Sequence, residues 1–390
     1  MSDIRTDRLV AFVSDLVAIP SENPPGAAYD ACVERIAAEL QACGIRYELL
    51  ETGTPEERRT CILGSVGDGP ALLYLHGHYD VVPAFTQDQF TPRVVDGCLV
   101  GRGASDMKGG LASMVYGAAA AAERGARVGL VIVPDEETGG KFGAEALAFP
   151  GLLDPKAAGA ILAEPTWGTI WHAARGAYTL RVSAHGLAAH VGLHYEGSNA
   201  FETALQAVSA LQPLQEALRD RLSHLAFASE HPRARESIML VGGLAEGGTS
   251  FNVIPERFSF TIDRRPNPEE DYDEATAELE QALQAAKRRG VRIVWHVLQD
   301  ARSAYTPPDS PLARTLADAV GAVTGERPSL TCCPGVLEIR VYHVLGIPAL
   351  AFGPGLMESM HKPDEHVPVE NLAAAAEIYA RTAVALAEGV

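Results

Sequence analysis

Hydrophobic positions in the first part of the chain alternate between helical spacing and short continuous runs. Residues 6–18 and 27–42 have apolar side chains at helical spacing, and the turn-rich segment 21–26 separates them. An alanine-rich stretch at 110–124 is also predicted to be helical. Apolar runs typical of buried strands lie at 71–77, 128–134 and 158–164. Strands that alternate with helices predict an α/β domain with a mainly parallel sheet.

A different pattern begins near Gly176. Residues 178–186 alternate between apolar and polar positions, as a half-exposed strand does, and a long helix is predicted over 199–217. The remaining elements are two strands within 237–243 and 250–263, a helix over 271–289 and a closing strand near 291–298. This βαββαβ order predicts a compact α+β domain inserted into the first one.

The α/β pattern returns after the insertion, with elements at 311–323 (helix), 347–353 (strand) and 369–387 (helix). We therefore expect 1–176 and 301–390 to form one domain and 177–300 to form the inserted domain. A chain of 390 residues agrees with two domains, because a single hydrophobic core stops growing beyond roughly 250–300 residues.

Composition and charge narrow the class of protein. A hydrophobic content of 47% with 21% charged residues excludes a globally disordered chain. The formal net charge of −18 repels phosphate backbones and anionic lipid, so we expect neither nucleic acid nor a membrane surface as a partner. The N-terminal segment has no basic region followed by an apolar one, and no run of about 18 apolar residues occurs, which predicts a cytoplasmic protein.

The six cysteines form no C-x-x-C pair, and in a chain of this length we expect them to be reduced. The adjacent Cys332 and Cys333 are candidates for a redox or metal site. No further cysteine lies near them in the sequence, so core packing is the favoured interpretation.

Polar side chains that favour metals appear where the apolar runs end. His78 and Asp80 follow the first run on one face of a strand, where the carboxylate can orient a metal-binding imidazole. Such a pair is more often structural when it stands alone. The glycine-rich segment 101–110 carries Asp106 into a helix. A phosphate-binding loop would require glycine at 106, and an aspartate there suits a cation better.

Three adjacent carboxylates, Asp135, Glu136 and Glu137, follow the next run. Like charges within a few ångströms raise one another's pKa, so the cluster requires a compensating positive charge unless it is a solvated acidic turn. Glu164 follows the third run, and His361 lies in a polar loop near the C-terminus. Ligands of α/β sheets bind beyond the carboxyl ends of the strands, which predicts that these groups meet.

The candidate ligands are two histidines and three or four carboxylates, without cysteine. This set suits Zn²⁺, Mn²⁺ or Co²⁺. It is too large for one catalytic zinc, which takes three protein ligands. Two metals that share one carboxylate fit the count.

The chain resembles the zinc-dependent amidohydrolases that include acetylornithine deacetylase, succinyl-diaminopimelate desuccinylase, aminoacylase and the glutamate carboxypeptidases. The motifs that carry this resemblance occur in the family's order and cover nearly the whole chain: HGHYDVVP, GRGASDMKGG, DEETGG, AEPT, GLAAHVGLHYEGSNA, NVIPERFSFTIDRR and HKPDEHV. The resemblance implies a dinuclear metallohydrolase domain, formed by 1–176 and 301–390, and an inserted domain for dimerisation or as a lid.

The resemblance also implies a role for each residue that matches a motif. The implied ligands are His78 and Glu164 for one metal, Glu137 and His361 for the other, and Asp106 as the bridge. Asp80 would orient His78, and Glu136 would be the general base. The implied cofactors are two Zn²⁺ per subunit, with Co²⁺ or Mn²⁺ as substitutes.

Residues of the inserted domain match the family as well. From the residues alone, His190 is a surface or packing histidine. The resemblance implies that it reaches the active site of the partner subunit in a homodimer and stabilises the developing oxyanion. Asn252 and Arg265 would bind the substrate carboxylate. Arg264 is the alternative to Arg265, although alternation from Asp263 favours Arg265.

The segment 333–340 departs from the family pattern. Relatives of the acetylornithine and diaminopimelate type often have a Ser/Thr-rich segment that ends in Asp and Arg, whereas this chain has apolar neighbours and Glu338. Arg340 still fits as a partner of the substrate carboxylate, with Gly335 as a further substrate contact. The departure leaves the acyl group and the amino acid of the substrate open.

We therefore predict a metal-dependent hydrolase that cleaves the amide bond of an N-acyl amino acid or a similar small carboxylate-bearing amide. A metal-activated water would attack, with Glu136 as the general base. One alternative is a dipeptidase or carboxypeptidase on the same scaffold. An alternative of another class is a non-catalytic metal-binding protein, which would be expected to lack Glu136 or a ligand.

Overall fold

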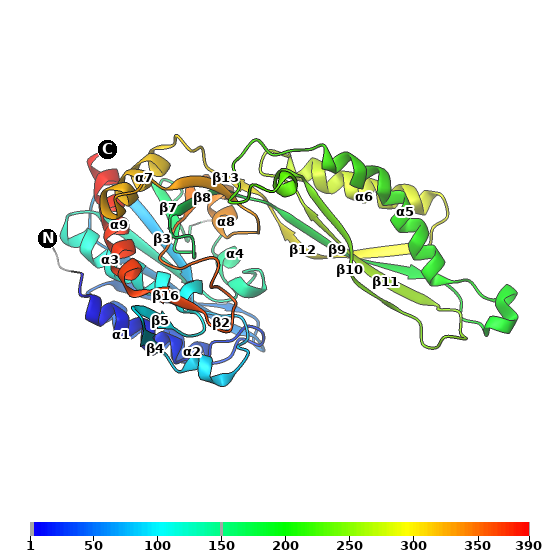
Figure 1. Cartoon of the computed structure of the whole chain (residues 1–390), viewed down its shortest axis with the longest axis horizontal. Helices are drawn as coiled ribbons and strands as arrows, with labels where there is room; N and C mark the ends of the chain where they lie inside the picture. Colours follow the sequence, from blue (N-terminus) through cyan, green and yellow to red (C-terminus); the bar gives the residue numbers. More distant parts are fainter. Residues whose placement is uncertain (1–3, 149–150, 390) are drawn as a thin grey trace. The chain divides into compact units, whose positions relative to one another are not determined.

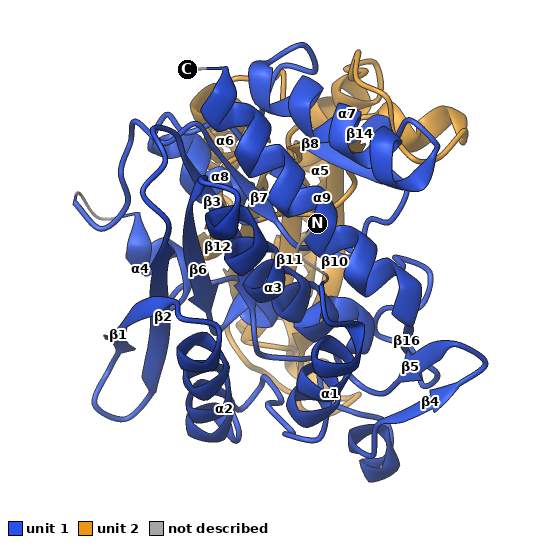
Figure 2. Ribbon diagram, turned by 90° about the vertical axis from the view of Figure 1, so that its left-hand side faces the viewer, with its two compact units in different colours: residues 1–172, 305–331, 338–390 blue, residues 173–304, 332–337 orange. Residues whose placement is uncertain are grey.

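The computed structural model describes residues 4–148 and 151–389. The chain divides into two compact units, which Figure 2 shows in different colours. Unit 1 comprises Met1–His172, Tyr305–Thr331 and Glu338–Val390, and unit 2 comprises Ala173–Ala304 and Cys332–Leu337. The short segment 332–337, which the sequence pattern assigns to the first domain, thus groups with the inserted unit.

A mixed sheet of nine strands, counted over the described residues, forms the centre of unit 1. Its strand order is β1-β2-β6-β3-β7-β15-β8-β13, and β14 pairs with β8. The bounds are β1 (Arg46–Gly53), β2 (Arg58–Val66), β3 (Leu72–His78), β6 (Arg127–Val133), β7 (Gly159–Leu162), β8 (Thr169–Ala174), β13 (Ala304–Tyr305), β14 (Ser329–Cys333) and β15 (Ala349–Ala351). The neighbours β6, β3, β7 and β15 are parallel, which confirms the predicted α/β class.

Helices cover this sheet. Their bounds are α1 (Thr6–Val17), α2 (Tyr29–Ala42), α3 (Gly109–Glu123), α4 (Ala144–Leu147), α7 (Pro311–Thr324), α8 (Ile339–Val344) and α9 (Val369–Glu388). A small sheet at one side contains β4 (Arg93–Val95), β5 (Cys98–Val100) and β16 (His366–Pro368). Local sequence explains helix ends such as those of α7, where Ser310 accepts a hydrogen bond from Ala313 N and Gly325 adopts φ +81°.

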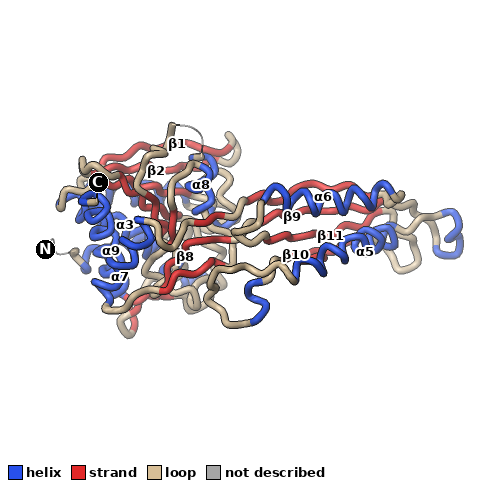
Figure 3. Tube along the Cα trace, turned by 90° about the horizontal axis from the view of Figure 1, so that it is seen from above, coloured by secondary structure: helices blue, strands red, loops and turns tan. Residues whose placement is uncertain are grey.

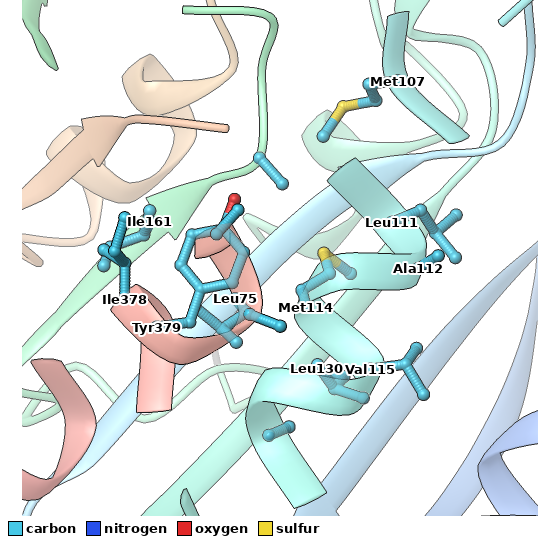
Figure 4. Close-up of a cluster of buried hydrophobic side chains, with 14 of the residues drawn as sticks. Leu75, Met107, Leu111, Ala112, Met114, Val115, Leu130, Ile161, Ile378 and Tyr379 are labelled. Atoms are coloured by element: carbon cyan, nitrogen blue, oxygen red, sulfur yellow. The ribbon is translucent and has the colours of Figure 1, made fainter. Parts of the chain in front are cut away.

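The main core of unit 1 lies where α3 and α9 pack on the parallel strands. Figure 4 shows Met114 of α3 on the side of the helix that faces Leu75 of β3, with Tyr379 of α9 beside Leu75. Met107 packs closely on β3 at Gly77, where a Cβ would lie 2.9 Å from Met107 Cε and would make that side chain shift. This close approach lets the loop that carries Asp106 pack directly against the end of β3.

The parallel strands bring their carboxyl ends to one edge of the sheet. His78 at the end of β3 is in register with Val133 at the end of β6, and His76 is in register with Leu162 at the end of β7. Asp80, the 135–137 carboxylates and Glu164 therefore leave the sheet at the same edge. The predicted meeting of the strand-end groups follows from this register.

Unit 2 is an α+β sandwich of the predicted βαββαβ order. Its elements are β9 (Ala177–His185), α5 (Ala200–Arg219), β10 (Ile238–Gly247), β11 (Arg257–Arg265), α6 (Tyr272–Arg288) and β12 (Ile293–Ala301). The four strands form an antiparallel sheet of order β10-β11-β9-β12. Both helices lie along one face of this sheet (Figures 1 and 3).

Alternation in β9 explains the two faces of that sheet. Leu180, Val182 and Ala184 are buried in the core of unit 2, whereas Arg181 and Ser183 between them are partly exposed. One face of the sheet is thus covered by the two helices, and the opposite face is partly exposed and mixes polar side chains with apolar ones such as Leu240 and Val294.

The structure differs from the sequence-based expectation in several elements, and two of the differences have a clear physical reason. The predicted strand over 250–263 begins only at Arg257, because Pro255 cannot donate a ladder hydrogen bond and the preceding residues form a loop. The hairpin of β1 and β2 was not predicted, since β1 is a largely exposed edge strand without an apolar run. Cys332 and Cys333 are both buried, as core packing predicts.

None of the helices in the described part of the chain combines the length and the apolar character that are required to span a bilayer.

Candidate metal centre

Two overlapping groups of side chains at the strand ends of unit 1 have the composition of metal sites. His78, Asp106 and Glu164 form the first group, and Asp106, Glu137 and His361 form the second. Within each group, one ligand atom of every residue lies within 4.8 Å of those of the others. Asp106 belongs to both groups, so the five predicted ligands meet around one shared carboxylate.

Hydrogen bonding within the two groups is incomplete. Buried polar atoms without a hydrogen-bond partner include His78 Nε2, Asp106 Oδ1, Glu137 Oε1 and Glu164 Oε1. Each belongs to a candidate ligand, and each is an atom type that coordinates Zn²⁺. A buried polar atom without a partner is costly, so a bound cation is the natural partner of all four. The residues therefore fit a dinuclear metal site.

The charges at this site are poorly balanced. Burial raises the pKa of Glu164 to about 8, and the charge of Asp106 adds to this effect. Desolvation raises the pKa of Glu136 well above its ordinary value, with contributions from the charges of Glu164 and Glu137. Hydrogen bonds to Asp106 and Glu137 raise the pKa of His361 to about 10. Carboxylates thus outnumber the cationic groups, and bound cations would restore the balance.

Asp80 connects His78 to the turn that carries the predicted base. Its backbone carbonyl lies 2.9 Å from His78 Nδ1, which leaves Nε2 of that ring for a metal. Its carboxylate accepts hydrogen bonds from Glu136 N at 3.3 Å and Glu137 N at 3.2 Å. The backbone of the short 3₁₀ turn η3 (Glu136–Thr138) is thereby fixed relative to β3.

Asn23 is a residue of this site that the sequence analysis missed. Its Nδ2 donates to Asp80 Oδ2 at 3.0 Å and lies 3.2 Å from Asp135 Oδ1. Asp135 adopts φ +75° just before the turn, and Arg59 Nε donates to its Oδ1 at 3.0 Å. The only sequence signal was the position of Asn23 in the turn-rich segment 21–26.

Glu338, the departure from the family pattern, is buried at the same edge of the sheet. Its Oε2 lies 2.6 Å from His76 Nε2, and Tyr342 Oη lies 2.9 Å from His76 Nδ1. Arg340 is 6% exposed, and its Nη2 donates to Gly139 O at 2.8 Å and to Glu145 Oε1 at 3.0 Å. The guanidinium expected at the substrate carboxylate thus binds the end of the turn that carries Glu136.

The other predicted substrate residues lie in unit 2. His190 is exposed, and its Nδ1 accepts a hydrogen bond from Gly192 N at 3.1 Å. Asn252 lies beside it, since Val191 N donates to Asn252 O at 3.0 Å. Gly335 belongs to the segment 332–337 of the same unit.

The structure distinguishes the two adjacent arginines. Arg264 is fully buried, and its Nη2 donates to Glu270 Oε2 at 2.6 Å. Arg265 is partly exposed, and its Nε donates to Asp263 at 2.9 Å. Arg264 thus has a structural role in the core of unit 2, whereas Arg265 is accessible to a ligand.

Comparison with known proteins identifies the family. A model of peptidase family M20/M25/M40 matches residues 74–385 of this chain. The chain belongs to that family. A succinyl-diaminopimelate desuccinylase of Methylorubrum extorquens is 30% identical over 400 residues, which cover 95% of this chain and 97% of the relative.

Solved structures of the M20 family share the fold. An M20 metallo-carboxypeptidase of Sulfolobus solfataricus aligns with a TM-score of 0.79 at 17% identity, over 100% of both chains. A dinuclear metal-binding M20 peptidase of Bacillus subtilis aligns with a TM-score of 0.71 at 18% identity, over 99% of both chains. The prediction of a metallohydrolase enzyme of this family is confirmed.

Proposed function

We propose that this chain hydrolyses the amide bond of an N-acyl amino acid or a similar small amide with a free carboxylate. The observation that carries the proposal is the pair of ligand groups that share Asp106, with Glu136 next to the ligand Glu137 but in neither group. The relatives named succinyl-diaminopimelate desuccinylases make N-succinyl amino acids the first substrates to test.

Two divalent metals, most simply Zn²⁺, would polarise the amide carbonyl and lower the pKa of the attacking water. His78 and Glu164 would hold one metal, Glu137 and His361 the other, and Asp106 both. Glu136 takes a proton from the attacking water and later delivers it to the leaving amine. Desolvation raises the pKa of Glu136, and a carboxylate with a raised pKa is a stronger base for the proton of the water. The products are one carboxylate and one amine.

His190 is proposed to stabilise the oxyanion in the site of a partner subunit. The hydrogen bond that its Nδ1 accepts from Gly192 N places the proton of the neutral ring on Nε2. Its Nε2–H is therefore a donor that can point at developing negative charge.

A homodimer through unit 2 is part of the proposal. Large apolar side chains are exposed on this unit, among them Leu187, Val191, Leu193, Tyr195, Leu240 and Phe251. Monomeric proteins rarely leave such groups uncovered when they are close together. The outer strands β10 and β12 also offer unpaired backbone groups at the edges of the sheet.

A cytoplasmic location is also part of the proposal. Cys32, Cys61 and Cys332 are buried thiols outside any disulfide, which agrees with a reducing compartment. Fractionation of the native cells with detection of the chain tests this point.

A dipeptidase or carboxypeptidase activity is the second candidate, because the metal ligands and Glu136 serve any amide. An assay panel separates the two functions. We expect turnover of N-succinyl, N-acetyl or N-formyl amino acids with Zn²⁺, Co²⁺ or Mn²⁺. Turnover of dipeptides alone would select the second candidate, and inactivity against the whole panel with metal bound would contradict the proposal.

Metal removal is expected to abolish turnover, because the water and the amide lose their activating cations. We expect two metal ions per chain by elemental analysis of the loaded protein, and full loss of activity after dialysis against a chelator. Zn²⁺, Co²⁺ or Mn²⁺ should restore activity. A single tightly bound ion in excess metal would argue against the bridge, and an active metal-free protein would contradict the mechanism.

Arg265→Ala is expected to raise KM for carboxylate-bearing substrates by about 10-fold, as expected for a lost hydrogen bond to a charged group. Arg264→Ala is expected instead to lower the free energy of unfolding by about 3 kcal/mol, because it leaves Glu270 without its buried partner. Steady-state kinetics and urea unfolding of both variants measure these effects. The opposite pattern would move the substrate role to Arg264.

A further inference from the structure

We propose that Glu365 is the positioning residue that holds His361 and Asp106 at the spacing required by the metal they share. This inference rests on the proposed dinuclear site. Glu365 is itself in neither ligand group. It would act on the metal only through the backbone of the residues that bind it.

The side chain of Glu365 is fixed by contacts to the Asp106 loop. It is 1% exposed, and its Oε1 accepts hydrogen bonds from Ser105 N at 3.1 Å and Asp106 N at 3.0 Å. Its Oε2 forms an ion pair with Nη1 of the buried Arg102. One oxygen thus holds the backbone of the shared ligand, and the other is neutralised by a cation.

The main chain around Glu365 is tied to the same loop. Gly101 N donates to Glu365 O at 2.9 Å. The buried Gln89 donates from Nε2 to the carbonyls of Lys362 and Pro363, both at 3.1 Å. Arg102 N in turn donates to Gln89 O at 2.9 Å. The segment 361–366, Gln89 and the glycine-rich loop therefore form one hydrogen-bonded assembly, to which Glu365 contributes a buried carboxylate.

His361 depends on this assembly because it has little support of its own. The side chain of His361 is 43% exposed, and its backbone adopts φ +59°. Its Nε2 lies 3.1 Å from Asp106 Oδ2 and 3.4 Å from Glu137 Oε2, which are themselves candidate ligands. The backbone on which the imidazole stands is held by contacts of Glu365 and Gln89, together with hydrogen bonds from Arg102 Nη1 to Lys362 O at 3.4 Å and from Met360 N to Leu356 O at 3.2 Å.

The two metals should respond unequally to loss of Glu365. Asp106 serves both metals, whereas His361 serves only one of them. Loss of a group that orients a ligand typically costs about 10–100-fold in metal affinity. We expect a loss of that size for the metal of Glu137 and His361, and a smaller loss for the metal of His78 and Glu164.

The experiment introduces Glu365→Gln into two backgrounds that each leave one site. Glu164→Ala leaves the site of Glu137 and His361, and His361→Ala leaves the site of His78 and Glu164. Zn²⁺ affinity is measured by competition with a chromophoric chelator, and the Co²⁺ absorption spectrum reports the ligand geometry. The expected result is an approximately 10–100-fold weaker Zn²⁺ affinity in the Glu164→Ala background and a smaller change in the other.

Glu270→Gln is the matched control. Glu270 also pairs with a buried arginine, Arg264, but in unit 2 and without contact to a ligand loop. It should lower stability without changing either Zn²⁺ affinity. If Glu365→Gln does not fold, Glu365→Asp serves, because it keeps the charge opposite Arg102 and withdraws the oxygen from Asp106 N.

Unchanged affinities in both backgrounds, or equal losses in both, would overturn the inference. If either result is found and the wild-type protein binds two metals, the inference about Glu365 fails but the proposed function stands. A wild type that binds no metal would instead refute the proposed function itself.

Discussion

Glu136→Gln is expected to lower kcat by a factor on the order of 10²–10⁴ while both metals stay bound. Glu136 is absent from the two ligand groups, so an amide in its place removes no metal ligand. The turn should remain in position, because Asp80 accepts hydrogen bonds from the backbone N–H groups of Glu136 and Glu137. These bonds do not involve the side chain that is changed. The variant loses only the group that carries the proton from water to the leaving amine.

Glu137→Gln is the control for this prediction. It alters the adjacent side chain in the same turn. Glu137 Oε1 is buried and has no hydrogen-bond partner, so this oxygen fits a metal ligand. We expect weaker metal binding there, with activity that recovers in part at high metal concentration. Elemental analysis and kcat of both variants separate the roles. If the Glu136→Gln variant loses metal and the Glu137→Gln variant keeps it, the roles assigned to the two residues must be exchanged.

The meeting of the five candidate ligands could be predicted because its signals are local in the sequence. Each candidate follows an apolar run or lies in a glycine-rich or polar loop, and a parallel sheet brings strand ends to one edge whatever their separation in the chain. The register of His78 with Val133 shows this directly. The β1 and β2 hairpin lacked such a signal, since its outer strand is exposed and polar.

The buried polar residues around the candidate ligands could not be predicted in this way. Asn23 lies 57 residues from Asp80, which it contacts. Glu365 lies 259 residues from Asp106, and Glu338 lies 262 residues from His76. No periodicity connects residues so far apart. Their roles depend on which carboxylate is buried beside which backbone N–H, and that is decided by the packing of loops.

The adjacent arginines show how far alternation alone can reach. Residues 264 and 265 must face opposite sides of β11, so alternation implies that only one of them enters the core of unit 2. Alternation does not determine which of the two arginines is buried. Burial of an arginine is unfavourable without a charged or polar partner, and the sequence does not show which arginine has one. Glu270 and Ser237 provide that partner for Arg264.

Mixing two inactive variants, His190→Ala and Glu136→Gln, is expected to restore activity if His190 acts across a homodimer. In a mixed dimer, the subunit with His190→Ala keeps its own Glu136 and metals, and receives an intact His190 from the Glu136→Gln subunit. One of the two sites is then complete and the other lacks both groups. Each mixed dimer should therefore show about half the wild-type activity, since a twofold dimer has two equivalent sites.

A second mixture tests whether restoration has this cause. Glu136→Gln mixed with Glu137→Ala should stay inactive, because both residues lie in the same short turn and every site takes both from one chain. Subunit exchange is verified in each mixture by mass spectrometry of differently tagged chains. Restoration in the first mixture alone is the expected result, because only there do the two defects lie in groups that different chains supply. If verified mixed dimers of the first pair stay inactive, His190 acts within its own chain or has a structural role.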